Sequence, residues 1–241
     1  MNIIQRLARN VIRSCGYDLV VRNKDAVGDD CYWDIKKSLR GNDKPVVIDV
    51  GANAGQTIAR VLEVAPHARI HSFEPSPSVF AELTTRYGGY SNVDLWNCGC
   101  GSRPGSLVLH ENEFSEMSSF LLPGKVGWGS VTKSVEVPVV SLDEWAERNQ
   151  IGAVDILKSD TQGFDLEVLK GAERLFSQGR IRIVLCEVNF LPLYAGMGRF
   201  EDLYSFLVDH KFAMVSLYKP KYHNGLMRDA DILFVRNEEG I

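Results

Sequence analysis

The segment VVIDVGANAG, residues 46–55, constrains the fold of this chain more than any other stretch. Its β-branched start is typical of a strand buried on both faces, and Gly51 and Gly55 permit the sharp turn that follows. Apolar residues then recur at helical spacing from Ile58 to Ala65. A strand, a glycine turn and a helix in this order build a nucleotide-type site at the carboxyl end of the strand.

The turn favours one kind of nucleotide ligand. Its G-x-x-x-G spacing lacks the third glycine of the dinucleotide fingerprint and the lysine of the P-loop. Asp49 would repel a phosphate, but it suits a ligand with positive charge, such as the ammonium and sulfonium groups of S-adenosylmethionine. Glu74 follows the next apolar segment, about two dozen residues past Gly51, where an acid holds ribose hydroxyls in Rossmann-like sites. We therefore expect a cofactor site formed by Asp49, Gly51, Gly55 and Glu74.

Three ordered motifs resemble those of a known family. They are IDVGANAGQT, FEPSPSVFAEL and VDILKSDTQGFDLEVLKGAERL, and they are similar to successive motifs of the FkbM family of S-adenosylmethionine-dependent methyltransferases. The similarity runs from about Val46 to about Val235. It implies methyl transfer from S-adenosylmethionine to a hydroxyl of a carbohydrate, such as a glycan or glycolipid precursor, or of a secondary metabolite.

Alternating strand and helix patterns predict a mostly parallel sheet with helices on both faces. A single helix is expected after Gly163, with Val168 to Phe176 supplying its apolar face. The segments Phe212–Leu217 and Asp231–Val235 resemble the closing antiparallel pair of a class I methyltransferase, which makes the sheet seven-stranded and the α/β domain Rossmann-like. We assign residues 31–241 to this domain and residues 1–30 to an N-terminal amphipathic helix and a polar linker.

The resemblance places further residues at the cofactor. It implies that residues 51–55 lie near the methionine end, that residues 97–99 lie beside the adenine, and that Ser118 and Ser119 either line the site or are ordinary loop residues. The residues expected to bind the cofactor are Asp49, Gly51, Ala52, Asn53, Gly55, Glu74, Ser76, Asn97, Cys98, Gly99, Ser118 and Asp160.

Asp160 and Glu187 are the predicted catalytic residues, because both follow strands and a hydroxyl acceptor must lose its proton as the methyl group arrives. Two schemes stay open. Asp160 acts directly as base or hydrogen-bond acceptor, or Asp160, Glu187 and Asn189 hold a magnesium ion that lowers the pKa of the hydroxyl. The magnesium scheme is not favoured, since many members of the family have an acid where Gln162 stands.

Composition narrows the set of partners. The formal charge of −4 gives no reason to expect nucleic acid. The five cysteines contain no C-x-x-C and indicate neither a disulfide framework nor a zinc site. No apolar run is long enough to span a bilayer, and we expect a cytoplasmic protein. Residues 1–13 interleave apolar residues with arginines, so this segment either packs on protein or contacts an anionic membrane surface.

Several alternatives remain open at this point. Lys158 either pairs with Asp155 or Asp160 or steers an anionic substrate. Tyr194 either stacks against a sugar or packs under a loop. A nicotinamide-dependent oxidoreductase and a non-catalytic cofactor-binding module are the competing functions. The acceptor and the oligomeric state are not determined by the sequence.

Overall fold

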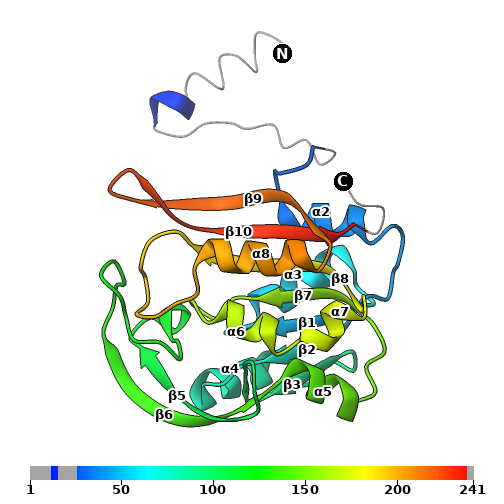
Figure 1. The fold of residues 1–241 in the computed structure, drawn as a ribbon, viewed down its shortest axis with the longest axis horizontal. Coiled ribbons are helices and arrows are strands. Elements are labelled where there is room, and N and C mark those ends of the chain that lie inside the picture. The colour runs from blue at the N-terminus through cyan, green and yellow to red at the C-terminus, as the bar shows by residue number, and fades with distance from the viewer. Residues whose placement is uncertain (1–11, 16–25, 238–241) are drawn as a thin grey trace.

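The computed structural model describes residues 12–15 and 26–237. Within these residues, seven strands form a sheet in the order β3-β2-β1-β7-β8-β10-β9 (Figure 1). They are β1 (Val46–Val50), β2 (Arg69–Phe73), β3 (Val93–Trp96), β7 (Val154–Ser159), β8 (Ile181–Asn189), β9 (Phe212–His223) and β10 (Leu226–Arg236). The first five in sheet order run parallel, and β10 runs antiparallel to both of its neighbours. The mostly parallel, seven-stranded α/β sheet is therefore confirmed.

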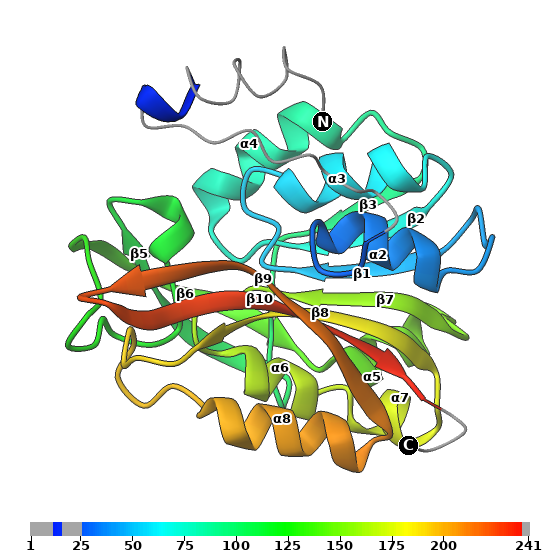
Figure 2. The same cartoon turned by 90° about the horizontal axis from the view of Figure 1, so that it is seen from above.

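Helices cover both faces of the sheet, as the alternating pattern predicts (Figure 2). One face carries α2 (Cys31–Ser38), α3 (Gln56–Val64) and α4 (Pro77–Tyr87), and the other carries α5 (Leu142–Arg148), α6 (Asp165–Lys170), α7 (Glu173–Ser177) and α8 (Phe200–Asp209). Strand residues alternate between the two apolar cores. Val47 and Ile156 pack toward the face of α2 and α3, whereas Ile48 and Leu157 pack toward the opposite face.

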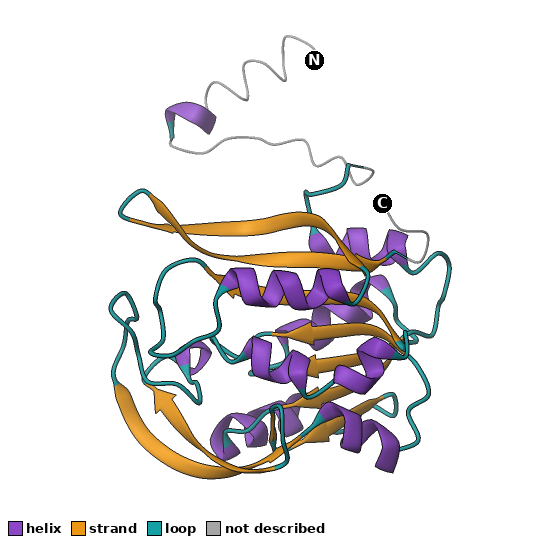
Figure 3. Cartoon of the chain, in the orientation of Figure 1, coloured by secondary structure: helices purple, strands orange, loops and turns teal. Residues whose placement is uncertain are grey.

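A second sheet of three strands lies beside the first (Figure 3). Within the described residues, its order is β4 (Gly99–Cys100), β6 (Val131–Val140) and β5 (Gly105–Asn112). A 3₁₀ helix, η1 (Ser115–Met117), lies in the connection between β5 and β6. This connection carries Ser118 and Ser119, and it reaches the carboxyl ends of the main strands through a hydrogen bond from Ser119 Oγ to the Gln162 carbonyl oxygen (2.8 Å).

The single helix expected after Gly163 is two short helices. The helix is interrupted at Gly171, between α6 and α7, where a Cβ atom would lie 2.1 Å from the Gly101 carbonyl oxygen. This close approach lets β4 pack beneath the break. The predicted apolar face is retained on both helices, and all five of its residues are buried: Val168, Leu169, Ala172, Leu175 and Phe176.

The closing hairpin is longer than the sequence patterns predict. β9 and β10 meet at Asn224 and Gly225, whose φ angles of 49° and 78° suit a two-residue hairpin turn. The Asn-Gly pair is a strong hairpin signal in any sequence, and it extends the pairing well beyond the apolar segments.

Helix α2 was not predicted, and it is fastened to the closing hairpin. The Asp34 carboxylate accepts hydrogen bonds from the Gly28 amide (2.8 Å) and from the Tyr218 hydroxyl on β9 (2.7 Å). The Asp30 side chain caps the helix by accepting from the Tyr32 amide (3.0 Å). These contacts hold α2 over the strands of the closing half of the sheet.

Most of the expected N-terminal amphipathic helix lies outside the described residues, apart from residues 12–14, which are helical. The linker predicted over residues 23–30 is likewise described only from residue 26. No helix in the described part of the chain has the length and apolar character needed to cross a membrane.

Candidate active site

A cavity of about 270 Å³ lies at the carboxyl ends of the parallel strands. One half is formed by the turn after β1 and by the ends of β2 and β4, and the other by α2, β7, β8 and the closing hairpin. Of the residues predicted for the site, those that line the cavity are Gly51, Ala52, Asn53, Glu74, Gly99, Ser118, Ser119 and Asp160. Those that do not line it are Asp49, Gly55, Ser76, Asn97, Cys98 and Glu187.

The turn after β1 is pinned between its two neighbouring strands. The amides of Gly51 and Ala52 both donate to the Phe73 carbonyl oxygen on β2, at 3.0 and 2.9 Å. Gly51 has a φ of 79°, and a Cβ atom there would lie 2.0 Å from the Asp160 carbonyl oxygen. Glycine is therefore required by backbone conformation and by the approach of β7. Gly55 has a φ of 89° and also makes room for packing, because its Cβ atom would lie 2.2 Å from the Tyr87 ring.

Glu74 is held with its carboxylate at the cavity wall. One oxygen accepts from the Asn53 amide and the other from the Ser76 amide, both at 2.8 Å. The side chain is 7% exposed, and burial raises its pKa to about 7. An acid fixed in this way at the end of the second strand can accept hydrogen bonds from a diol.

Three residues predicted to bind the cofactor lie next to the end of β2, outside the cavity lining. Ser76 Oγ caps α4 by accepting from the Val79 amide (3.4 Å). Asn97 Nδ2 donates to the Glu74 carbonyl oxygen (2.9 Å), and Cys98 is buried in the apolar core. Their side chains hold the wall of the cavity in place and do not line it.

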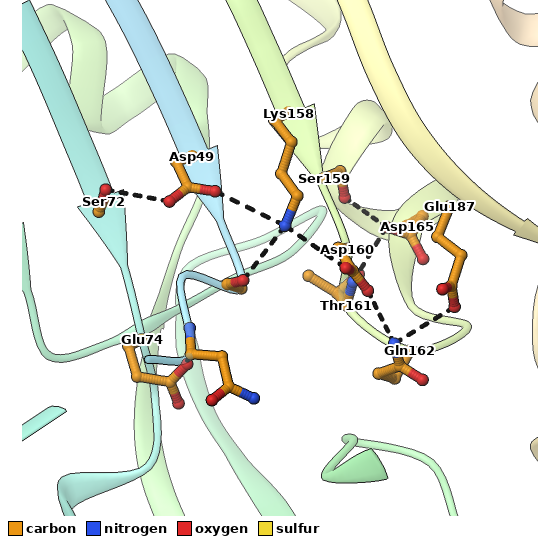
Figure 4. Close-up of polar contacts among 12 residues, drawn as sticks. Asp49, Ser72, Glu74, Lys158, Ser159, Asp160, Thr161, Gln162, Asp165 and Glu187 are labelled. Carbon is orange, nitrogen blue, oxygen red and sulfur yellow. Dashed lines mark hydrogen bonds and ion pairs between the residues drawn. The ribbon is translucent and has the colours of Figure 1, made fainter. Parts of the chain in front are cut away.

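Asp49 is fully buried and is joined to the site through a lysine (Figure 4). Lys158 Nζ lies 3.6 Å from Asp49 Oδ1 and 3.5 Å from Asp160 Oδ2, and it donates to the Gly51 carbonyl oxygen (3.3 Å). Burial raises the pKa of Asp49, while Lys158 and a hydrogen bond from Ser72 oppose the rise. The two acids raise the pKa of Lys158 against its own burial, so its ammonium stays charged. Asp49 therefore holds Lys158 at the site, and its own side chain does not line the cavity.

Of the two alternatives for Lys158, the structure shows ion pairing. Its partners are Asp49 and Asp160, whereas Asp155 pairs with Arg182 at 3.1 Å. This pairing joins the ends of β1 and β7 at the cavity, which Lys158 itself lines.

The two predicted catalytic acids are brought together by an amide. Gln162 Nε2 donates to Asp160 Oδ1 (2.7 Å) and to Glu187 Oε1 (3.2 Å), as Figure 4 shows. The Tyr194 hydroxyl donates to Gln162 Oε1 (2.6 Å), which fixes the orientation of the amide. Burial and the neighbouring Asp160 raise the pKa of Glu187 well above its usual range. The Asp160 side chain is 33% exposed and lines the cavity, so it is the acid that an acceptor can reach.

A buried acid fixes the loop that carries these groups. Asp165 Oδ1 accepts from the Ser159 hydroxyl (2.5 Å) and from the Thr161 amide (3.1 Å). Gln162 itself has a φ of 55°, which is uncommon for a residue other than glycine. The strained Gln162 backbone is thus braced by Asp165, a contact that the sequence patterns do not reveal.

Two of the residues proposed for magnesium, Asp160 and Glu187, are joined by the Gln162 amide, and the third, Asn189, has a buried Oδ1 without a hydrogen-bond partner among the described residues. In the described residues, no group of three or more His, Cys, Asp or Glu side chains is arranged to hold a metal ion. The Gln162 amide presents hydrogen-bond donors between Asp160 and Glu187, where a cation would need oxygen ligands. Lys158 and Lys221 already lie within 3.6 Å of these two acids. We derive no step through a metal ion.

Sequence reasoning missed several residues of the second half of the cavity. Tyr32 on α2, Leu185 on β8, Lys219 on β9 and Asp231 on β10 all line it. A run of helical spacing after Asp30 and the Asn-Gly turn at residue 224 are the signals that could have placed these elements at the site.

Comparisons with known proteins agree with the motifs. The family model described as the methyltransferase FkbM domain matches residues 49–214. The chain is 24% identical over 170 residues to the 2-O-methyltransferase NoeI of Sinorhizobium fredii, covering 66% of this chain and 69% of that protein. It is 26% identical over 225 residues to the 31-O-demethyl-FK506 methyltransferase FkbM of Streptomyces tacrolimicus, covering 80% and 82%.

A solved structure shares the fold. The structure of a methyltransferase FkbM from Methylobacillus flagellatus KT superposes with a TM-score of 0.55 at 18% identity. The match covers 86% of this chain and 48% of that one, so the chain spans about half the length of that structure. The likeness confirms the Rossmann-like class I methyltransferase architecture.

Proposed function

The chain belongs to the FkbM family and is an S-adenosylmethionine-dependent methyltransferase, and we propose that its acceptor is a hydroxyl of a carbohydrate or of a secondary metabolite. The names of both relatives above refer to methylation on oxygen, which supports a hydroxyl acceptor. Family membership favours this function over a nicotinamide-dependent oxidoreductase or a non-catalytic module. The observation that carries the proposal is the Asp160–Gln162–Glu187 cluster at the edge of the cofactor cavity.

The first half of the cavity suits the cofactor. Glu74 offers carboxylate oxygens to the ribose hydroxyls, and the turn from Gly51 to Asn53 lets the ligand approach the backbone closely. Asp160 supplies negative charge where the strand ends meet. S-adenosylmethionine would supply a methyl group on a positively charged sulfur, and a nearby carboxylate stabilises such a charge.

Asp160 is the proposed base. It accepts the proton of the acceptor hydroxyl as the oxygen forms its bond to the methyl carbon and the bond from carbon to sulfur breaks. Holding the two reactants in line supplies roughly 7–11 kcal/mol, whereas a base contributes about 10²–10⁴-fold, or roughly 3–5 kcal/mol. Positioning therefore outweighs proton removal, and the fixed geometry of the cluster matters more than the strength of the base.

Glu187 and Tyr194 act on Asp160 through the Gln162 amide. Because the Tyr194 hydroxyl holds the amide oxygen, both Nε2 hydrogens point toward the acids. Burial raises the pKa of Glu187, whereas Asp160 is the acid of the cluster that lines the cavity. We propose that Gln162 positions this carboxylate toward the acceptor.

The test is methyl transfer from labelled S-adenosylmethionine to a panel of glycans, glycolipid precursors and hydroxylated metabolites, with the product bond identified by NMR. We expect an O-methyl product, and we expect Asp160→Asn to lower kcat by about 10²–10⁴-fold. Glu113→Gln, a substitution of an exposed acid in the connection after β5, is the matched control. Transfer to nitrogen, or labelling unchanged by Asp160→Asn, would contradict the proposal.

A further inference from the structure

The Lys219 side chain lines the cavity, although in a regular strand the side chain at this position would point to the opposite face of the sheet. Tyr218 and Asp231 are partners across β9 and β10, and Asp231 pairs with Glu187 on β8. Tyr218 reaches α2 through its hydroxyl, so this row faces the side of the sheet that carries α2. Successive strand residues point to opposite faces, and the residue after Tyr218 should therefore point away from the cavity.

A β-bulge reverses that direction. Asp231 pairs with Tyr218 while Asp229 pairs with Lys221, so Lys219 and Pro220 together oppose Ala230. Lys219 has a φ of 46°, a left-handed conformation that is costly for a lysine. Bulges commonly redirect a side chain next to a functional site, and here Lys219 lines the cavity together with Asp231, the partner of Tyr218. The strain is maintained at a cavity wall, which points to a role for this ammonium.

The Lys219 side chain is exposed, and Asp231 is a charged neighbour of its ammonium at the cavity wall. Across the described residues this ammonium forms no ion pair, whereas the other cations of this half are engaged: Lys158 with Asp49 and Asp160, Lys221 with Glu187 and Asp229, and Arg60 with Asp30 and Glu63. Asp231 lines the same half, and burial raises its pKa against the opposing charge of Lys219, so the repulsion of an anion by Asp231 is weakened. The Tyr32 side chain lines the cavity from α2.

The sheet register places Lys219 on the acceptor side of Asp160. The register aligns Val50 on β1 with Ser159 on β7 and Cys186 on β8. The next residues, Asp160 and Glu187, therefore begin a second row of neighbours. This row continues through Asp231 on β10 to Tyr218 on β9. Neighbouring strands lie about 4.8 Å apart. Three strand spacings from β7 to β9 therefore place the backbone of β9 at Tyr218 and Lys219 about 14 Å from the backbone of Asp160. Glu74 lies two strands away in the opposite direction.

We propose that the half of the cavity between α2 and the bulge of β9 is a subsite for an acidic sugar, in which Lys219 binds the carboxylate of the acceptor. Asp231 and Tyr32 face the same space and can hydrogen-bond the ring hydroxyls. The inference deepens the proposed function and rests on it, because it assigns a substrate class to the acceptor side of the same site.

The test compares two probes that differ by one carboxylate, D-glucuronate and D-glucose. Each is titrated by NMR into the full chain saturated with S-adenosylhomocysteine. We expect the wild type to have at least about tenfold higher affinity for glucuronate than for glucose, because a charge-assisted hydrogen bond contributes that much to binding. Lys219→Gln should abolish the preference and Lys219→Arg should keep it. Lys211→Gln is the matched control, because Lys211 is also exposed with a φ of 68° but does not line the cavity.

Equal binding of the two sugars by the wild type, no binding of glucuronate, or a preference that survives Lys219→Gln would overturn the inference. A tenfold loss of S-adenosylhomocysteine affinity in Lys219→Gln with the sugar preference intact would assign the lysine to the carboxylate of the cofactor instead. If Lys219→Gln does not fold, Lys219→Gly, which suits the positive φ, carries the same test. Failure of the proposed function would appear separately, as no transfer to any hydroxyl by the wild type.

Discussion

Removing the Lys158 ammonium should destabilise the chain through the charge that it leaves behind. In Lys158→Met, the Asp49 carboxylate is fully buried without a cation. At 3.6 Å and an effective dielectric constant of about 20, the lost attraction is about 5 kcal/mol. Asp49 can limit the loss by taking up a proton. From its ordinary pKa of 3.8 to pH 7, protonation costs about 4 kcal/mol, and this smaller figure is the expected loss.

The stability lost in Lys158→Met should depend on pH. Lys158 lowers the pKa of Asp49 relative to the variant, so its contribution is present at neutral pH and declines as Asp49 becomes protonated. At pH 5 the cost of protonation falls to about 2 kcal/mol. Urea unfolding followed by tryptophan fluorescence at the two pH values measures the difference.

Two further variants isolate the buried charge. Asp49→Asn/Lys158→Met removes both charges and should recover most of the stability, because a stranded ion is the main penalty. Lys170→Met breaks an exposed ion pair with Glu167 (2.7 Å) and should cost less than about 1 kcal/mol. An equal loss in the single and double variants, or a loss that does not change between pH 7 and pH 5, would refute the reasoning.

Three other substitutions test the rest of the site. Gly51→Ala should cost several kcal/mol because its Cβ atom would meet the Asp160 carbonyl oxygen, whereas Gly89→Ala, with nothing within 4 Å, should be tolerated in the same thermal melts. Glu74 has a folded pKa of about 7 against 4.5, so the chain should lose about 3 kcal/mol of stability through this group as pH rises from 4.5 to 7. Glu74→Gln should lack that slope in urea unfolding. Gln162→Leu should lower kcat at least tenfold with cofactor affinity unchanged in equilibrium titration, and an unchanged kcat would remove the amide from the proposed mechanism.

The alternation of strands and helices and the cofactor half of the cavity could be predicted because they depend on local signals. Buried β-branched runs, the glycine turn and an acid at the second strand end are written in short segments such as residues 46–55. Glu74 and Gly51 accordingly line the cavity where the motif spacing places them. The break at Gly171 was missed because it depends on Gly101, a residue far away in the sequence.

The contacts that hold Asp160 and Glu187 and the residues on the closing hairpin could not be predicted, because they join distant segments. Asp49 appears in the sequence as a free acid beside a cofactor turn, and its neutralisation by Lys158 needs the pairing of β1 with β7. Lys219 is directed by a register shift between β9 and β10, which no periodicity reveals. The Gln162 amide joins its two acids by the same kind of long-range placement.

Calorimetric titration of S-adenosylhomocysteine into the wild type and into Glu74→Ala tests the central claim most directly. The cavity at the strand ends should give saturable heat in the wild type, and loss of the carboxylate at the ribose position should weaken binding at least tenfold. No heat with the folded wild type, or equal affinity in the two proteins, would contradict the placement of the cofactor in this cavity.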